Sequence, residues 1–202
     1  MKWIAPMLAY LAVGLGLFQF HSAWCTLVGF HVAILFSLLV VRPEIPIAVL
    51  LKTTNPKWVT LSVLLCGSSG VALFFLWGYF GIANDLPAQA ASLGLNAQAW
   101  VLFIAYFALV NPFLEEYFWR GYLGHPSRRI RLHDLVYAGY HALVLIGRVH
   151  FGSIIFALVM LTFAGWFWRQ VAREDQGLLV PVLGHMAADF TILVTIFKMT
   201  AT

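Results

Sequence analysis

The feature that most constrains this chain is a succession of long apolar runs that follow one another almost from end to end. A helix needs about 20 mostly apolar residues to cross about 30 Å of hydrocarbon. Seven runs are candidates: Ile4–Phe20, Ala23–Val41, Trp58–Ile82, Ala99–Leu123, Leu135–Gly147, Phe151–Trp168 and Leu178–Phe197. We therefore predict an all-α, polytopic membrane helix bundle of about seven transmembrane helices. The runs leave no room for a separate soluble domain, so residues 1–202 form a single integral membrane domain.

Composition supports this prediction and excludes several classes of protein. The chain is 62% hydrophobic and 10% charged, whereas a soluble chain has about 45–50% apolar and about 25% charged residues. These values exclude a disordered protein and a small disulfide-framework protein. With 12 Lys and Arg against 8 Asp and Glu, the basic residues are too sparse to track a phosphate backbone. We expect the lipid bilayer, and no nucleic acid, as a partner.

The basic residues indicate how the chain is oriented. If Met1 is cytoplasmic, only Arg148 and Lys198 fall in outside segments. The inside segments then hold Lys2, Arg42, Lys52, Lys57, Arg128, Arg129, Arg131, Arg169 and Arg173. Cytoplasmic loops carry the excess of Lys and Arg, so we predict a cytoplasmic N-terminus and an outside C-terminus. The first run is not followed by a convincing small-x-small cleavage site, and we expect it to remain as the first span.

Ionisable side chains inside the predicted spans point to function, because each charge in hydrocarbon costs at least about 2.5–3.5 kcal/mol. The spans contain His31, Glu115, Glu116, Arg120, His141, His185 and Asp189. Glu116 and Arg120 are four residues apart and can form an ion pair on one helix face. Glu115 is rotated by about 100° from Glu116 and is therefore left for another role. His31 stands alone in its span, and we interpret it as a hydrogen-bonded packing residue.

Three of these residues, Glu116, His141 and His185, are predicted to lie at a similar depth in the membrane. At about 1.5 Å per residue, Glu116 lies about 12 Å from the cytoplasmic end of its helix. The same arithmetic places His141 roughly 10 Å and His185 about 12 Å from the ends of theirs. We therefore predict one site just below the cytoplasmic face, with Asp189 one turn deeper behind His185.

Two chemistries fit such a site. A carboxylate beside a histidine can deprotonate a water molecule, and a second histidine can donate to the oxyanion that follows. No serine or cysteine stands at a comparable level, so a covalent acyl-enzyme is not favoured. Alternatively, Glu115, His141 and His185 could hold a catalytic zinc ion, since two histidines and a glutamate form a known ligand set. Spacing alone leaves both chemistries open.

Three short motifs resemble one known family. The residues Glu-Glu-Tyr-Phe-Trp-Arg-Gly at 115–121 are similar to the EExxxR motif of the CAAX-protease and bacteriocin-processing (CPBP or Abi) family. Tyr137 and His141 resemble its FxxxH motif, and His185 and Asp189 its HxxxN or HxxxD motif. The resemblance covers residues 99–197, which we expect to form the catalytic core.

The resemblance implies a multi-spanning membrane peptidase related to the type II CAAX prenyl endopeptidases. It implies that Glu115 activates water with help from His141, that Glu116 and Arg120 form a structural ion pair, and that His185 with residue 189 forms the oxyanion hole. It favours a metal-free glutamate mechanism, with zinc as the alternative. Tyr137 stands where the family usually has Phe, and Asp189 where the prenyl-processing enzymes have Asn.

The implied activity is cleavage of a peptide bond near the cytoplasmic face, and the implied location is a bacterial inner or plasma membrane. The substrate would be a C-terminal sorting or anchor segment, a leader peptide, or a prenylated CAAX-type tail. The competing hypotheses are a non-enzymatic immunity or chaperone-like membrane protein and a small proton-coupled transporter that uses the same carboxylates. The sequence shows no internal repeats of the kind that carriers often have.

Overall fold

The computed structural model describes residues 3–200, and every regular element in that range is a helix. Five helical stretches are long and apolar enough to cross a membrane. They are α2 (Ala23–Val41), α3 (Pro56–Leu76) with η3 (Trp77–Tyr79), α5 (Ala97–Glu116) with η4 (Tyr117–Tyr122), α8 (Phe151–Asp175) and α9 (Leu179–Thr200). A shorter apolar helix, α1 (Ile4–Gly14), continues as η1 (Leu15–Gln19). The predicted all-α polytopic bundle is confirmed.

The fifth apolar run is not the continuous span that we expected over Leu135–Gly147. It consists of α6 (Leu132–Gly139) and α7 (His141–Leu145), which are separated at Tyr140. The cause lies in another helix, because the Tyr10 hydroxyl donates to the Val136 carbonyl over 2.7 Å. In an uninterrupted α-helix the amide of Tyr140 would donate to that carbonyl. An insertion of this kind is a known way to break a helical hydrogen-bond ladder.

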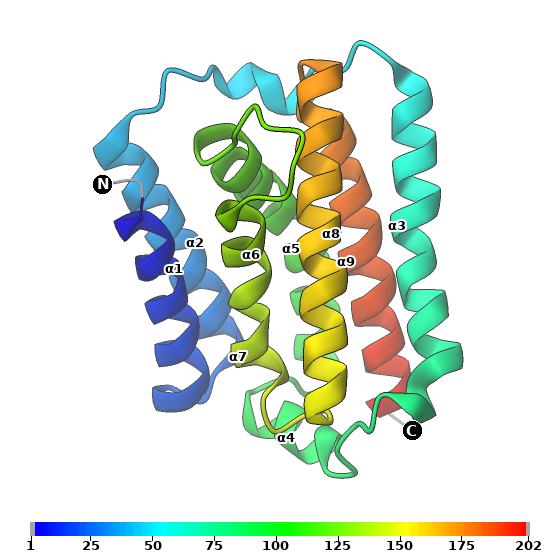
Figure 1. Cartoon of the computed structure of the whole chain (residues 1–202). Helices are drawn as coiled ribbons and strands as arrows, with labels where there is room; N and C mark the ends of the chain where they lie inside the picture. Colours follow the sequence, from blue (N-terminus) through cyan, green and yellow to red (C-terminus); the bar gives the residue numbers. More distant parts are fainter. Residues whose placement is uncertain (1–2, 201–202) are drawn as a thin grey trace.

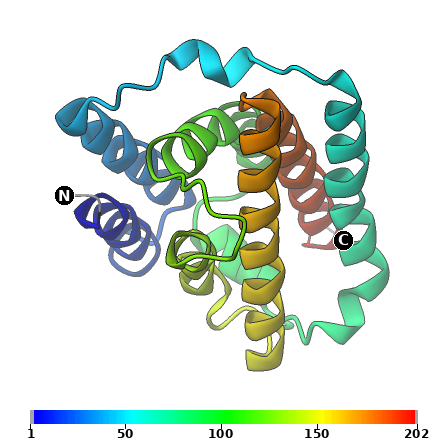
Figure 2. The same ribbon diagram turned by 45° about the horizontal axis from the view of Figure 1, so that its top comes forward.

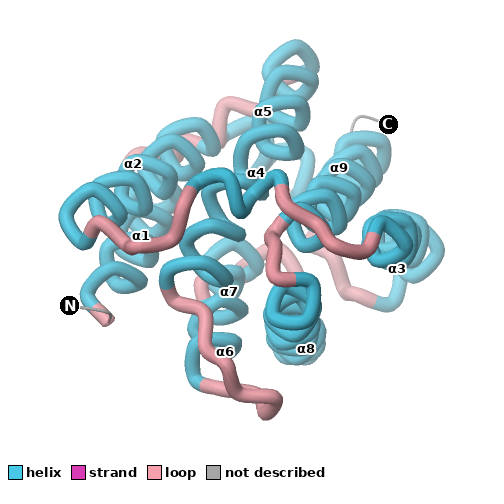
Figure 3. Tube along the Cα trace, turned by 90° about the horizontal axis from the view of Figure 1, so that it is seen from above, coloured by secondary structure: helices cyan, strands magenta, loops and turns pink. Residues whose placement is uncertain are grey.

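The helices form one pair on each side of the bundle, with α5 to α8 between them (Figures 1 and 3). In Figures 1 and 3, α1 and α2 lie together on one side, and α3 and α9 lie together on the other, with α5, α6, α7 and α8 between them. The contacts agree, since α1 packs on α2, α3 and α5 pack on α9, and α6 packs on α8. Large apolar side chains on the outer surfaces, such as Leu39, Phe75 and Phe151, are exposed, as expected for helices that face lipid.

The two ends of the bundle differ in which connections they carry. The segment 42–55, the loop 123–131 and the turn from α8 to α9 lie at the same end as the N-terminus, and the C-terminus lies at the opposite end (Figures 1 and 2). These connections carry most of the basic residues that we predict to be cytoplasmic. The orientation of this end in a membrane remains a prediction.

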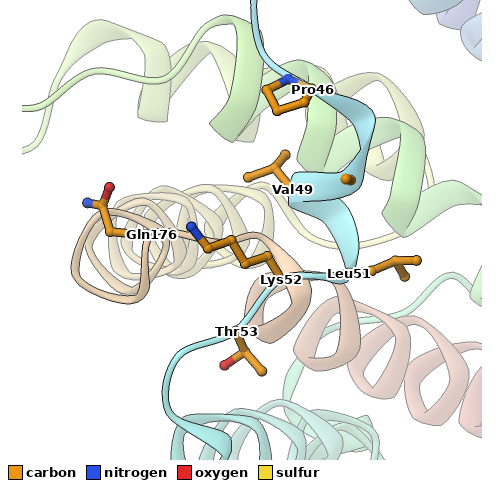
Figure 4. A pocket seen from close by; sticks show the side chains of 7 residues that line it. Pro46, Val49, Leu51, Lys52, Thr53 and Gln176 are labelled. Atoms are coloured by element: carbon orange, nitrogen blue, oxygen red, sulfur yellow. The ribbon is translucent and has the colours of Figure 1, made fainter.

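Residues 43–55, which we call the strap, connect α2 to α3 across this end of the bundle. The strap includes the short 3-10 helix η2 (Ile47–Leu51) and lies over a groove of about 530 Å³ beside Lys52 and Gln176 (Figure 4). It is fastened at two places, because the Tyr117 hydroxyl donates to the Ile45 carbonyl over 2.5 Å and the Leu178 amide donates to the Val49 carbonyl over 2.9 Å. The strap therefore ties the end of α5 to the start of α9.

A short helix lies at the opposite end of the bundle (Figure 1). The helix α4 (Leu86–Ser92) belongs to the connection between α3 and α5, in the Ala-rich segment between two apolar runs. The Ala23 amide at the start of α2 donates to the Leu93 carbonyl over 2.9 Å. This contact joins α4 to the start of α2.

Candidate active site

The site is built around Glu115, a carboxylate that is 1% exposed in the middle of the bundle. Its Oε1 accepts a hydrogen bond from Asn111 Nδ2 at 2.9 Å, and its Oε2 accepts one from Trp119 Nε1 at 3.1 Å. These three residues are spaced four apart and therefore share one helix face. Helix α5 thus supplies a carboxylate together with two of the donors that stabilise its charge.

A third donor to Glu115 comes from the break between α6 and α7. The hydroxyl of Tyr140 lies 2.8 Å from Oε1 and 2.9 Å from Oε2 of Glu115. The ring of His141 stacks on Tyr140 with centroids 4.0 Å apart. Tyr140 thus reaches α5 from the connection between α6 and α7, and His141 lies beside it.

His141 is oriented by the backbone. Its Nδ1 lies 3.2 Å from the Ala138 carbonyl, and a carbonyl only accepts, so Nδ1 carries the hydrogen. In the neutral ring Nε2 is then left with a lone pair. No hydrogen bond joins His141 directly to Glu115 within residues 3–200; Tyr140 stands between them.

Glu116, the neighbour of Glu115, has a different set of partners. Its Oε1 lies 3.1 Å from Arg120 Nη1 and 2.8 Å from His185 Nδ1, and Glu116 is completely buried. The Arg120 guanidinium lies over the Tyr137 ring, 3.9 Å from its centroid, an arrangement favourable for a cation. The helix widens to π geometry over Tyr117–Tyr122, directly after Glu116 and including Arg120, as often happens at functional sites.

His185 and Asp189 close the site from α9. The ring of His185 stacks on Trp168 with centroids 4.9 Å apart, and its Nε2 lies 3.5 Å from Oδ1 of Asp189. The second oxygen of Asp189 lies 3.3 Å from Nδ2 of Asn111. Asn111 therefore contacts both Glu115 and Asp189, the carboxylate beside His185.

The structure places the residues predicted from the sequence in one region. Glu115, Glu116, Arg120, His185 and Asp189 form a connected network of hydrogen bonds and ion pairs, and His141 lies beside it, stacked on Tyr140.

Sequence reasoning missed several members of the site. These are Asn111, Trp119, Tyr140 and Trp168. His31 is buried and hydrogen-bonded to Asn111 and Tyr106, which confirms the interpretation of a hydrogen-bonded packing residue. Asn111 and Trp119 had a detectable signal, since each is four residues from Glu115.

A metal ion is not favoured by this geometry. No three His, Cys, Asp or Glu side chains among the described residues are grouped so that they could hold an ion. Of the zinc ligands considered, Glu115 has its oxygens turned to Asn111, Trp119 and Tyr140, and His185 has Nδ1 turned to Glu116. The described residues at this site do not fit a zinc centre.

The arrangement supports acid–base chemistry. Glu115 is a buried carboxylate without a cation beside it, and His141 has one ring nitrogen without a hydrogen. The second histidine, His185, lies between the carboxylates of Glu116 and Asp189. Within a polytopic helix bundle, such a site is suited to hydrolysis inside the membrane.

The comparison with known families agrees with this class. Residues 97–191 match the family described as type II CAAX prenyl endopeptidase Rce1-like. This match supports membership of the CAAX-protease (CPBP) family, a family of membrane proteases. The match runs from the start of α5 into α9 and includes all three motifs, while α1 to α4 lie outside it. No curated protein and no solved structure matched the chain.

Proposed function

We propose that this protein is an intramembrane endopeptidase in which Glu115 and His141 activate water for attack on a peptide bond. The observation that carries the proposal is the contrast between two adjacent glutamates. Glu116 is neutralised by Arg120 at 3.1 Å, whereas Glu115 is held by neutral donors only. Glu115 therefore has no ion-pair partner, and a carboxylate beside a histidine can take the proton of a water molecule.

In the proposed reaction, Glu115 and Nε2 of His141 accept hydrogen bonds from one water molecule. The water oxygen attacks the peptide carbonyl carbon while its proton passes to Glu115, and the carbonyl becomes a tetrahedral oxyanion. His185 lies between the carboxylates of Glu116 and Asp189 and acts here with a hydrogen on both ring nitrogens. Its Nε2–H stabilises this oxyanion. The C–N bond then breaks, and the proton on Glu115 passes to the leaving amine, so that the products are a carboxylic acid and an amine.

Tyr140 has a supporting role in this scheme. Its hydroxyl donates to both oxygens of Glu115, so it stabilises the negative charge before water is deprotonated. Rotation of the hydroxyl toward one oxygen frees an acceptor position on the other oxygen for the water molecule.

The proposed substrate is a membrane-anchored or precursor peptide cut near the cytoplasmic face. The proposed substrate classes are a C-terminal sorting or anchor segment, a leader peptide, and a prenylated CAAX-type tail. We propose a bacterial inner or plasma membrane with the N-terminus in the cytoplasm, because the strap and the other basic connections lie at the end of the bundle that carries the N-terminus.

The proposal is tested by co-expressing the protein with tagged members of the three substrate classes. We expect a product with wild type and none with Glu115→Ala, His141→Ala or His185→Ala. Glu44→Gln, which changes an exposed carboxylate of the strap, is the matched control and should cleave like wild type. A product that persists with all three site variants would refute the proposed catalytic roles.

We propose that no metal ion takes part. Protein purified in a chelator should then retain its cleavage rate, and metal analysis of the active protein should find much less than one ion per chain. Loss of activity in chelator that is restored by zinc would replace this proposal with the zinc alternative.

A further inference from the structure

Asn111 occupies a position between two carboxylates of the site. Its Nδ2 lies 2.9 Å from Oε1 of Glu115 and 3.3 Å from Oδ2 of Asp189. Carboxylate oxygens accept hydrogen bonds, and an amide nitrogen has two hydrogens to donate. The contacts therefore use both hydrogens and point the Nδ2 end of the amide toward the carboxylates, with the side chain 1% exposed.

The other end of this amide faces α2. Nε2 of His31 lies 3.0 Å from Oδ1 of Asn111, and Nδ1 of His31 lies 3.1 Å from the hydroxyl of Tyr106. Since Oδ1 accepts, Nε2 of His31 carries the hydrogen, and the bare Nδ1 accepts from Tyr106. Tyr106, His31 and Asn111 thus form a chain in which every donor points toward the two carboxylates.

We propose that His31 and Asn111 are positioning residues for Glu115 and Asp189. His31 holds the Asn111 amide with its NH₂ group toward both carboxylates, and that amide sets the distance between the water-activating carboxylate and the one beside His185. This inference rests on the proposed function. It adds a residue from outside the matched range 97–191, so α2 contributes to the site.

The orientation matters because the two ends of an amide have opposite roles. If the Asn111 amide turned by 180°, Oδ1 would face the oxygens of Glu115 and Asp189, and three acceptors would meet without a hydrogen between them. The hydrogen bond from His31 is lost in that orientation, since two donors would then oppose each other. A side chain that cannot donate at position 31 removes the contribution of α2 to this preference, and Oδ1 of Asn111 loses its donor. The amide, and with it Glu115, is then held less firmly.

The activity test compares full-length protein purified into lipid nanodiscs. The probe is a fluorogenic peptide with a farnesylated cysteine three residues from its C-terminus, alongside the anchor and leader substrates that wild type cleaves in cells. We expect His31→Leu to lower kcat roughly 10- to 100-fold with KM within about twofold, because loss of positioning at a reacting centre is costly. We expect His31→Gln to recover most of the loss, since its amide can still donate to Asn111.

A control separates positioning from simple loss of packing. Leu27 lies one turn before His31 on α2 and is 4% exposed in an apolar cluster. Leu27→Ala should lower the unfolding temperature while kcat of the folded protein stays within about twofold of wild type. If Leu27→Ala lowers kcat as much as His31→Leu, or if His31→Leu has wild-type kcat, the inference is wrong.

A second measurement does not depend on activity. In protein with ¹⁵N-labelled histidine, the ring nitrogens of His31 are assigned by the signals that disappear in His31→Gln. We expect a hydrogen on Nε2 and none on Nδ1, and a mixture of the two tautomers in Asn111→Leu. A hydrogen on Nδ1 with a bare Nε2 in wild type would overturn the inference.

The two proposals fail in different ways. If wild type cleaves nothing, or if Glu115→Gln is as active as wild type, the proposed function fails, and the histidine tautomer still decides whether His31 orients Asn111. If Glu115→Gln is inactive and His31→Leu is fully active, the protease proposal stands and the role of His31 is rejected.

Discussion

Two buried arginine–carboxylate clusters in this protein differ in how completely their polar atoms are paired. At the N-terminal end of the bundle, Arg169 donates to both oxygens of Asp134, from Nε at 2.9 Å and from Nη2 at 2.7 Å. Its remaining donors reach the carbonyls of His125, Ser127 and Arg129, and the Arg131 amide also donates to Asp134. This cluster is saturated, and it fixes the loop between η4 and α6.

The cluster on α5 is left incomplete. Oε2 of Glu116 and Nη2 of Arg120 are buried without a hydrogen-bond partner in the described part of the chain, and Glu115 has only neutral donors. Buried polar groups are almost always paired, so unpaired ones need an explanation. In the proposed mechanism, the saturated cluster serves the fold, and the incomplete cluster, which includes Glu115, serves the reaction.

The largest expected effect comes from removing the charge at the incomplete cluster. Glu115→Gln keeps the size of the side chain but cannot accept a proton, so we expect cleavage to fall by about 10²- to 10⁴-fold. Asp134→Asn should leave kcat of the folded protein within a fewfold of wild type. The check is initial cleavage rates of both purified variants, normalised to folded protein. Equal losses in the two variants would remove the distinction between the clusters.

Breaking the saturated cluster should act on stability instead. Arg169→Ala leaves Asp134 buried without its cation, and we expect a loss of about 3–5 kcal/mol in the free energy of unfolding. Arg173→Ala removes the arginine of a partly exposed pair with Glu174 and should cost at most about 1 kcal/mol. Denaturant titration of both variants tests this, and a loss no larger for Arg169→Ala than for Arg173→Ala would contradict it.

A smaller effect is expected from one donor to Glu115. Trp119→Phe removes the indole N–H that lies 3.1 Å from Oε2, and a hydrogen bond to a charged group is worth about 1.5–3 kcal/mol. We expect kcat/KM to fall about tenfold, since Tyr140 still donates to the same oxygen. Trp166→Phe is the matched control, because its indole donates to the Arg128 carbonyl away from the site. Trp119→Phe with wild-type kinetics would show that this donor does not support the carboxylate.

The smallest effect is expected at Tyr137, where the family usually has Phe. Tyr137→Phe keeps the ring under the Arg120 guanidinium, so we expect less than about a twofold change in kcat/KM. Tyr137→Leu removes the ring and should cost about 0.5–2 kcal/mol of stability. Thermal unfolding together with cleavage rates distinguishes the two variants; an effect of Tyr137→Phe as large as that of Tyr137→Leu would show that the hydroxyl is required.

Much of the fold could be predicted because each long apolar run carries its own signal. The fifth run was the exception: its helix ends early because the hydroxyl of Tyr10, 126 residues away, donates to the Val136 carbonyl. No pattern within the run shows that contact. The break lies at Tyr140, the residue that donates to Glu115.

The site could be predicted as far as spacing within one helix allows. The pairs Glu116 with Arg120 and His185 with Asp189 follow from residues four apart. Asn111 and Trp119 have the same spacing from Glu115, but an amide and an aromatic residue at helical spacing are common in any membrane helix. Tyr140 and His31 reach the site from other helices, and only the packing of α2, α5 and α6 brings them together.

The most direct test of the account is cleavage in ¹⁸O-labelled water by purified wild type and Glu115→Gln, followed by mass spectrometry of the product and of the protein. If Glu115 activates water, the new C-terminal carboxyl of the wild-type product carries one ¹⁸O atom, Glu115 stays unlabelled, and the variant forms no product above background. Label in the Glu115 carboxyl, or the same product from Glu115→Gln, would contradict the account.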